Sequence, residues 1–203
     1  MKSKRLHASV EQRSVLHAGF LTLSRYIFRV EKHDGGHRDL TWEVMERGHA
    51  VAVLGFDPIL DRVVLISEFR PGVLLAGDYP FTDNLVAGGM EENESAEEAA
   101  VREMREETGL QLSEPRVVHP GAYVSSGGTS EKITLVFGFV DTANAGGVHG
   151  NAEESEDILT VILPARQFID RVRAAQITDL KTMVAGYWFA ENYRRLKKVT
   201  TDD

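Results

Sequence analysis

The chain has 203 residues, a net charge of −8, no cysteine, and 42% hydrophobic residues. This composition fits one large globular domain, or one domain with a small accessory unit, and it excludes disulfides, a thiol nucleophile and a zinc–thiolate site. So acidic a chain is a poor general binder of nucleic acid, which needs clustered Lys and Arg, and no run of about 18 apolar residues is present to span a membrane.

The first predicted segment covers residues 1–47. Its start is basic but has no apolar stretch, so it does not resemble a secretory signal; together with the lack of cysteine, this favours a cytoplasmic location. Alternating residues at 21–30 and 40–44, around a glycine turn at 34–36, predict a β-hairpin with a third strand near Val15. So small a sheet cannot bury both faces alone, and we expect it to pack on the main domain or on another subunit.

The predicted main domain covers residues 48–203 and begins with strands. Apolar runs at 49–56 and 62–69 predict two of them. Residues 71–84 contain two prolines and two glycines and are predicted to form a loop, and residues 85–87 a short apolar strand.

A helix with clear start and stop signals follows. Ser95 and Glu98 form a capping box, residues 96–108 are good helix formers, and Gly109 is typical of a helix end. The stretch also has a fixed pattern: Gly88, five residues, Glu94, seven residues, Arg102-Glu103-Met104, one residue, Glu106-Glu107, one residue, Gly109-Leu110.

Three carboxylates share one face of this helix. Glu103, Glu106 and Glu107 are spaced i, i+3 and i, i+4, so their like charges repel by a few tenths of a kcal/mol per pair. Arg102 can pair with Glu106, and a hard divalent cation bound by Glu103 and Glu107 would offset the remaining repulsion. The alternative is a solvated acidic helix face.

The residues before the helix favour the metal site. Gly88 and Gly89 let the backbone approach a ligand closely, and the carbonyl of Ala87 is a plausible further ligand. Strand, glycine loop, acidic helix and glycine stop together predict a compact cradle for a metal ion.

Strands are predicted again at 116–124, 132–140 and 158–163. Residues 141–157 are predicted to form a long loop, which contains Glu153, Glu154, Glu156 and Asp157. Carboxylates that bind a metal ion, as predicted for Glu103 and Glu107, are poor bases, so this segment is a candidate source of a general base. The alternative is that its acidic side chains are only solvated surface residues.

The C-terminal part is predicted to be helical. Phe168, Val172 and Ala175 mark one helix, and residues 180–191 follow the helical period of a second, in which aromatic residues 187–188 fit a core better than a nucleobase platform. The order of elements predicts an α/β fold: an α/β/α sandwich with a mixed sheet, plus a small N-terminal antiparallel β-sheet.

The pattern from Gly88 to Leu110 is that of the Nudix box, and over about residues 15–195 the chain resembles the ADP-ribose pyrophosphatase branch of the Nudix hydrolases. The matches outside the box are Glu46-Arg47-Gly48-His49-Ala50, Phe56-Asp57-Pro58, Val63-Val64-Leu65-Ile66, Arg70, Gly127-Gly128-Thr129-Ser130-Glu131, and His149-Gly150 leading through Ala152-Glu153-Glu154 to Glu156-Asp157-Ile158.

This resemblance implies a Nudix-type fold and Mg²⁺-dependent cleavage of ADP-ribose to AMP and ribose 5-phosphate, with two or three metal ions per site and Mn²⁺ as a possible substitute. It also implies a homodimer formed through the exchanged N-terminal sheet. Matched residue by residue, it implies metal ligands at Ala87 (carbonyl), Glu103, Glu107 and Glu156, a general base at Glu154, bracing by Arg102 and Glu106, and substrate contacts from Phe20, Arg70 and Glu131.

Two positions depart from the family pattern. Ser126 stands where the family usually has proline, and Trp42 stands where close relatives carry an arginine that holds the adenine end. Trp42 either stacks on the base or is a packed strand aromatic. The alternatives are a pyrophosphatase for another nucleotide sugar, such as GDP-mannose or ADP-glucose, and a sensor that binds ADP-ribose without cleaving it.

Overall fold

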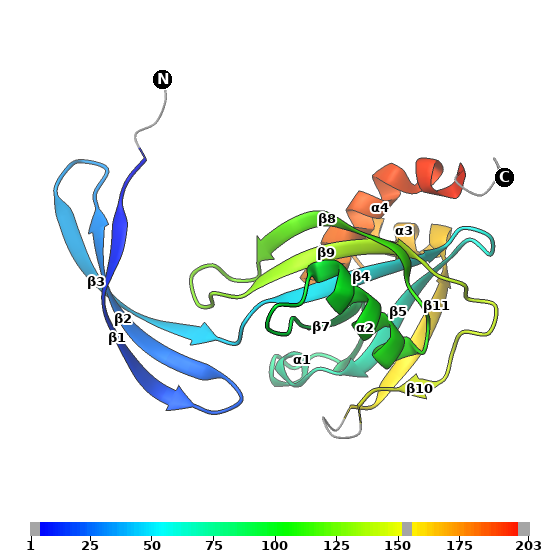
Figure 1. Cartoon of the computed structure of the whole chain (residues 1–203), viewed down its shortest axis with the longest axis horizontal. Coiled ribbons are helices and arrows are strands. Elements are labelled where there is room, and N and C mark those ends of the chain that lie inside the picture. The colour runs from blue at the N-terminus through cyan, green and yellow to red at the C-terminus, as the bar shows by residue number, and fades with distance from the viewer. Residues whose placement is uncertain (1–4, 152–155, 199–203) are drawn as a thin grey trace. The chain divides into compact units, whose positions relative to one another are not determined.

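The computed structural model describes residues 5–151 and 156–198 (Figure 1). The chain divides into two compact units. The smaller one combines the N-terminal segment with residues 123–132, whereas the sequence predicts these residues within the main domain. The first unit comprises Met1–Gly48 and Tyr123–Lys132, and the second His49–Ala122 and Ile133–Asp203. That 1–47 and 48–203 act as separate domains stays a prediction.

The first unit is built on a three-stranded antiparallel sheet, β1 (Ala8–Ala18), β2 (Thr22–Glu31) and β3 (His37–Glu46), in the order β1-β2-β3. The predicted hairpin and third strand are therefore confirmed. Gly35 and Gly36 turn the chain between β2 and β3 with φ of 97° and 73°, a backbone conformation that glycine adopts without steric cost.

This sheet has no hydrophobic core of its own. Among the described residues of the first unit, no hydrophobic side chain is buried. On one face, Tyr26 and Phe28 stack with ring centroids 5.4 Å apart, and Val15 and Trp42 are exposed on their neighbouring strands. The apolar side chains of this face are therefore left at least partly exposed by the described residues of their own unit.

The second unit contains a mixed sheet in the order β10-β11-β5-β4-β9-β8, with β6 paired to β5 and β7 paired to β4. The central strand β4 runs parallel to β9 and antiparallel to β5 and β7. The strands are β4 (Ala50–Asp57), β5 (Arg62–Phe69), β6 (Phe81–Asn84), β7 (Val86–Gly89), β8 (Ser113–Tyr123), β9 (Lys132–Phe139), β10 (Val148–His149) and β11 (Ile158–Pro164).

Helices cover both faces of this sheet (Figure 1). α2 (Ala96–Thr108) packs on one face through Ala99, Ala100 and Met104. α3 (Ala165–Arg173) and α4 (Leu180–Lys198) pack on the other, where Phe168 and Phe189 are fully buried. The predicted α/β/α sandwich with a mixed sheet is confirmed.

Four local predictions need correction. The predicted loop at 71–84 contains the short helix α1 (Pro71–Leu75) and strand β6, and the segment 141–157 contains β10. Both strands form by pairing with a neighbouring strand, β10 with β11 and β6 with β5, so their own composition does not reveal them. Ala175 lies beyond α3 with φ of 54°, and Tyr187 is half exposed, whereas Trp188 packs against the core as expected.

No helix in the described part of the chain is long and apolar enough to cross a membrane.

Candidate active site

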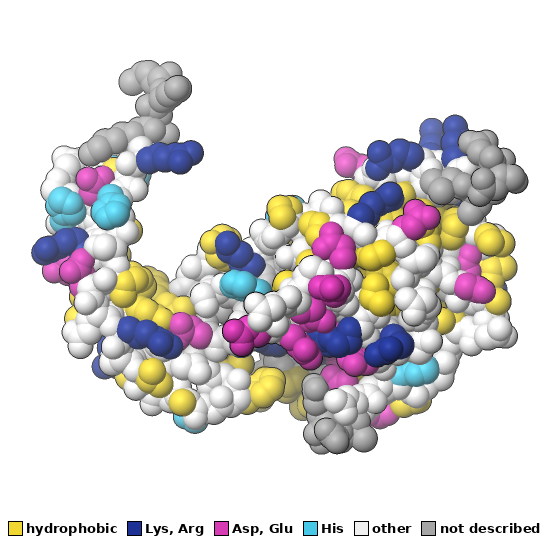
Figure 2. Space-filling model, viewed as in Figure 1, with side chains coloured by type: hydrophobic (Ala, Val, Ile, Leu, Met, Phe, Trp, Pro, Cys, Tyr) yellow, Lys and Arg dark blue, Asp and Glu magenta, His cyan; other side chains and the backbone are white. Residues whose placement is uncertain are grey.

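Helix α2 carries the acidic face identified in the sequence. The Ser95 hydroxyl accepts a hydrogen bond from the Glu98 backbone, the Glu98 carboxylate accepts one in return from the Ser95 backbone, and Gly109 ends the helix with φ of 71°. Figure 2 shows acidic side chains gathered along this helix. The helix begins and ends where the sequence predicted.

The carboxylates of this face are not equally solvated. Glu103 is 8% exposed and Glu107 is 3% exposed, whereas the side chain of Glu106 is nearly half exposed. A solvated acidic face is therefore excluded for Glu103 and Glu107. Buried carboxylates are rare unless a cation or hydrogen bonds stabilise them.

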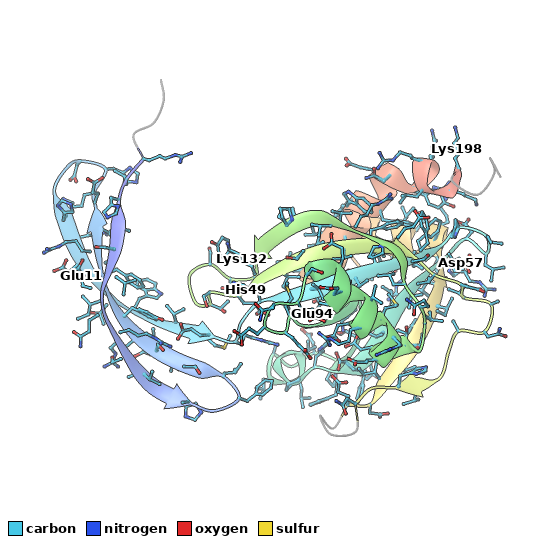
Figure 3. The ribbon with its side chains drawn as sticks, viewed as in Figure 1. Glu11, His49, Asp57, Glu94, Lys132 and Lys198 are labelled. Atoms are coloured by element: carbon cyan, nitrogen blue, oxygen red, sulfur yellow. The ribbon has the colours of Figure 1, made fainter. Side chains whose placement is uncertain are left out.

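Arg102 connects this helix to the preceding loop. Its guanidinium makes a bidentate ion pair with Glu94, with Nε–Oε1 and Nη2–Oε2 distances of 2.9 and 3.0 Å (Glu94 is labelled in Figure 3). It also contacts the carboxylates of Glu103 at 2.7 Å and Glu106 at 3.2 Å, and it donates to the carbonyl of Gly89 at 2.9 Å. Arg102 thus braces both the loop and the helix, and its charge offsets part of the repulsion along α2.

Glu107 carries a strongly perturbed carboxyl group. Its Oε2 accepts a hydrogen bond from the backbone N–H of Ala87 at 3.1 Å. Burial and then the charge of Glu103 raise the pKa of Glu107 to about 9, and the Ala87 hydrogen bond opposes them. The charges of Glu68 and Glu156 contribute to the raised pKa of Glu107, so four carboxylates share one electrostatic environment.

Gly88 makes room for Glu103. A Cβ built on Gly88 would overlap the Glu103 carboxylate, whereas a Cβ on the adjacent Gly89 would meet nothing within 4 Å. From the sequence, these glycines are expected to let a ligand approach closely; at Gly88 the approaching group is a carboxylate of the chain itself. The missing side chain lets Glu103 lie directly against strand β7.

We expect Gly88→Ala to lower the affinity for Mg²⁺ and the activity by at least about tenfold, since the added methyl group must displace the Glu103 carboxylate. Calorimetric titration with Mg²⁺ and an initial-rate assay measure the two effects. Gly89→Ala is the matched control and should stay within about twofold of wild type. Equal losses in the two variants would contradict the explanation.

Glu68 was not singled out in the sequence, although the structure places it in the same region. It lies on β5 two residues before Arg70, pairs with the Arg70 guanidinium, and its side chain is 15% exposed. Alternation along the strand could have indicated that these two side chains share a face.

Glu156 is hydrogen-bonded to the backbone of Asn151, whose N–H donates to the Glu156 Oε2 at 2.9 Å. The proposed base, Glu154, falls outside the described residues. Within 5–151 and 156–198, no three His, Asp or Glu side chains are arranged closely enough to enclose a metal ion. A site formed by Glu103, Glu107 and Glu156 stays a prediction.

The other candidate substrate residues, Phe20, Trp42 and Glu131, belong to the first unit. Phe20 is 94% exposed. Trp42 is half exposed, and its indole Nε1 donates a 2.6 Å hydrogen bond to the carbonyl of Gly127. Neither alternative for Trp42 included this bond, which the sequence could not reveal because the two residues are 85 positions apart.

The segment containing Gly127 is attached to β3 at further points. The N–H of Met45 donates to the carbonyl of Gly128 at 2.9 Å, and the carbonyl of Met45 accepts from Ser130 at 3.3 Å. Glu131 is buried and lies 3.5 Å from the Arg47 guanidinium. The loop that carries Glu131 is therefore held as part of the first unit.

Known proteins resemble this chain over nearly its whole length. The model of the NUDIX domain family matches residues 48–180. ADP-ribose pyrophosphatase of Escherichia coli (strain K12) is 36% identical over 186 residues, covering 91% of this chain and 88% of that protein. ADP-ribose pyrophosphatase of Haemophilus influenzae is 34% identical, covering 90% and 86% of the two chains.

More distant similarities point the same way. A GDP-mannose pyrophosphatase of Escherichia coli O1:K1 / APEC is 29% identical over 173 residues, covering 84% of this chain and 88% of that protein. A crystal structure described as an ADP compounds hydrolase superimposes with a TM-score of 0.70 at 20% identity, covering 94% of this chain and 98% of that one, and so shares the fold. The family model matches most of the chain, the box is intact and its acidic helix is braced by Arg102. The chain therefore belongs to the Nudix family and is a Nudix hydrolase.

Proposed function

We propose that the chain hydrolyses the diphosphate bond of a nucleoside diphosphate sugar, and that its preferred substrate is ADP-ribose, which yields AMP and ribose 5-phosphate. The observation that carries the proposal is the pair of buried carboxylates, Glu103 and Glu107, held against β7 next to Arg102. The names of the relatives at 34–36% identity support ADP-ribose as the substrate. A GDP sugar is the second candidate, because a GDP-mannose pyrophosphatase also resembles the chain at 29% identity.

The donor set of α2 fits a hard divalent cation. Nudix hydrolases are generally dependent on divalent metal ions, and carboxylate and carbonyl oxygens are the ligands that Mg²⁺ prefers. Among the described residues Glu107 has no ion-pair partner, and its neighbours Glu103, Glu68 and Glu156 add only negative charge. We assign Mg²⁺, replaceable by Mn²⁺, in two or three copies per site. The ligands of this assignment are the Ala87 carbonyl, Glu103, Glu107 and Glu156.

When bound, Mg²⁺ neutralises phosphoryl oxygens and lowers the pKa of water. The chain's own groups then have three tasks. Glu154 accepts the proton of the attacking water as general base. Arg102 and Glu106 brace the loop and the helix. The substrate is bound by Arg70, Glu131, Phe20 and Trp42.

A hydrolysis screen tests this function. Purified protein is incubated with ADP-ribose, ADP-glucose, GDP-mannose, NADH or a diadenosine polyphosphate, with Mg²⁺ or with EDTA, and the products are separated by chromatography. We expect the highest kcat/KM for ADP-ribose and no turnover in EDTA. Binding of ADP-ribose without turnover would instead indicate the sensor, and a preference for GDP-mannose would indicate the second candidate. A cytoplasmic location stays a prediction.

We expect the chain to be a homodimer at micromolar concentration through residues 1–47, since this sheet buries no hydrophobic side chain within its described unit. Sedimentation velocity of the full chain measures the association. Val15→Lys, on the apolar face with Phe28, should weaken the dimer at least about tenfold because it would bury an unpaired charge. Gln12→Lys, on the opposite face, is the charge-matched control. A wild-type monomer at micromolar concentration would refute the prediction.

A further inference from the structure

We propose that Glu68 is a positioning residue of this site, and that it orients the Arg70 guanidinium so that Arg70 can bind the diphosphate of the substrate. The inference rests on the proposed function, because it assumes that a nucleoside diphosphate occupies the region beside α2. Glu68 acts through Arg70 and is assigned no metal ion and no proton transfer.

The placement of Glu68 follows from strand alternation. Val64 and Ile66 of β5 pack in the cluster that contains Met104 of α2, whereas Val63 and Leu65 pack on the opposite side of the sheet. Side chains two residues apart in a strand share a face, so Glu68 lies on the α2 face. The backbone of Arg70 is also extended, with φ of −114° and ψ of 99°, which carries the alternation on to Arg70.

The backbone of Arg70 is held by hydrogen bonds at both its N–H and its carbonyl group. Its N–H donates to the carbonyl of Pro80 at 2.9 Å, and its carbonyl accepts from Val73 at 3.1 Å and from Leu74 at 3.2 Å. With the backbone fixed, only the side-chain torsions decide where the guanidinium points. The ion pair with Glu68 restricts them, and both side chains are largely buried, at 15% exposed for Glu68 and 31% for Arg70.

The electrostatic surroundings explain why an oriented cation is needed here. Burial raises the pKa of Glu68, the charges of Arg70 and Lys181 lower it, and the charge of Glu156 raises it. Lys181 is itself paired with Asp179, with Nζ and Oδ1 2.9 Å apart. Arg70 is thus a cation within a predominantly acidic region.

A guanidinium can serve Glu68 and a phosphate at once. It has five N–H donors in a rigid plane, so pairing one edge with a carboxylate leaves donors for phosphoryl oxygens. A freely rotating arginine would lose side-chain entropy on binding the diphosphate, and Glu68 removes much of this cost in advance. The effect therefore depends on the hydrogen-bond acceptor of Glu68 more than on its charge.

The test measures binding of the non-hydrolysable α,β-methylene ADP-ribose at saturating Mg²⁺ by calorimetry. Glu68→Ala should raise Kd about tenfold, because the Arg70 side chain must then be ordered on binding, and Glu68→Gln, which keeps the acceptor oxygen, should stay within about threefold of wild type. Arg70→Ala should raise Kd by at least about tenfold, and adding Glu68→Ala to Arg70→Ala should change nothing further. Asp83 lies on the neighbouring strand β6 and pairs with Arg171 of α3; Asp83→Ala is the control and should leave Kd unchanged.

Each contrary result overturns the proposal. Multiplicative losses in the double variant would mean that Glu68 acts independently of Arg70. Equal losses in Glu68→Gln and Glu68→Ala, with a higher Mg²⁺ requirement, would mean that Glu68 binds metal. Unchanged binding in Glu68→Ala, or no binding by wild type, would also overturn it. Failure of wild type to hydrolyse ADP-ribose while it still binds the probe contradicts the proposed function only.

Discussion

Glu107→Gln should lower kcat by roughly 10³-fold at saturating Mg²⁺, the order of loss expected when a group that stabilises the transition state is removed. The expectation follows from the position of Glu107, which is buried, hydrogen-bonded to Ala87 and adjacent to Glu103. Initial rates with ADP-ribose across a Mg²⁺ titration measure the loss. Glu92→Gln, in the exposed loop before α2, is matched in net charge and should retain full activity. More than a tenth of wild-type activity in Glu107→Gln would contradict the assignment.

The same variant should be more stable than wild type when metal is absent. The pKa of Glu107 is raised from 4.5 to about 9 in the folded protein, so the metal-free wild type loses stability as the pH rises from about 4.5 towards about 9. Glu107→Gln has no carboxyl to ionise and does not lose this contribution. Thermal unfolding in EDTA should therefore show a gap in Tm that widens with pH, and Mg²⁺ should raise the Tm of wild type more than that of the variant.

Glu154→Gln should lower kcat by about 10²–10⁴-fold with little change in KM or in Mg²⁺ requirement, which is the behaviour of a lost general base. Glu156→Gln should instead raise the Mg²⁺ concentration needed for half-maximal rate, because a lost ligand weakens metal binding. Rates measured over a Mg²⁺ titration separate the two effects.

The same titrations can also show that Glu154 and Glu156 have exchanged roles. If excess Mg²⁺ rescues Glu154→Gln and not Glu156→Gln, the two roles are exchanged. If neither variant loses activity, the base lies elsewhere, and Glu131 becomes the next candidate to replace with Gln.

The local features of helix α2 were predicted correctly. The capping box at Ser95, the glycine stop at Gly109 and the face shared by Glu103 and Glu107 depend on neighbours within a few positions, and the structure has all three. The two-layer cover of the mixed sheet followed from the order of strands and helices.

Features set by pairing between separate elements were missed. β6 exists because it pairs with β5, although its residues follow a proline- and glycine-containing stretch. The sequence shows that side chains alternate between the two faces of β5, but it does not show which face α2 covers. Both facts are needed to place Glu68 beside α2. The bond between Trp42 and Gly127 joins side chain and backbone across 85 positions, and no local pattern predicts such a contact.

That bond, with the pairing of Met45 to the segment around Gly128, has a consequence for synthesis on the ribosome. The strands β1 to β3 emerge first, yet the residues that complete their unit are made more than 80 positions later. A nascent chain released before residue 130 would have the N-terminal sheet without its final hydrogen bonds and with its apolar face open to other chains. The first unit can therefore reach its complete structure only after residues 49–122, about half of the second unit, have been made.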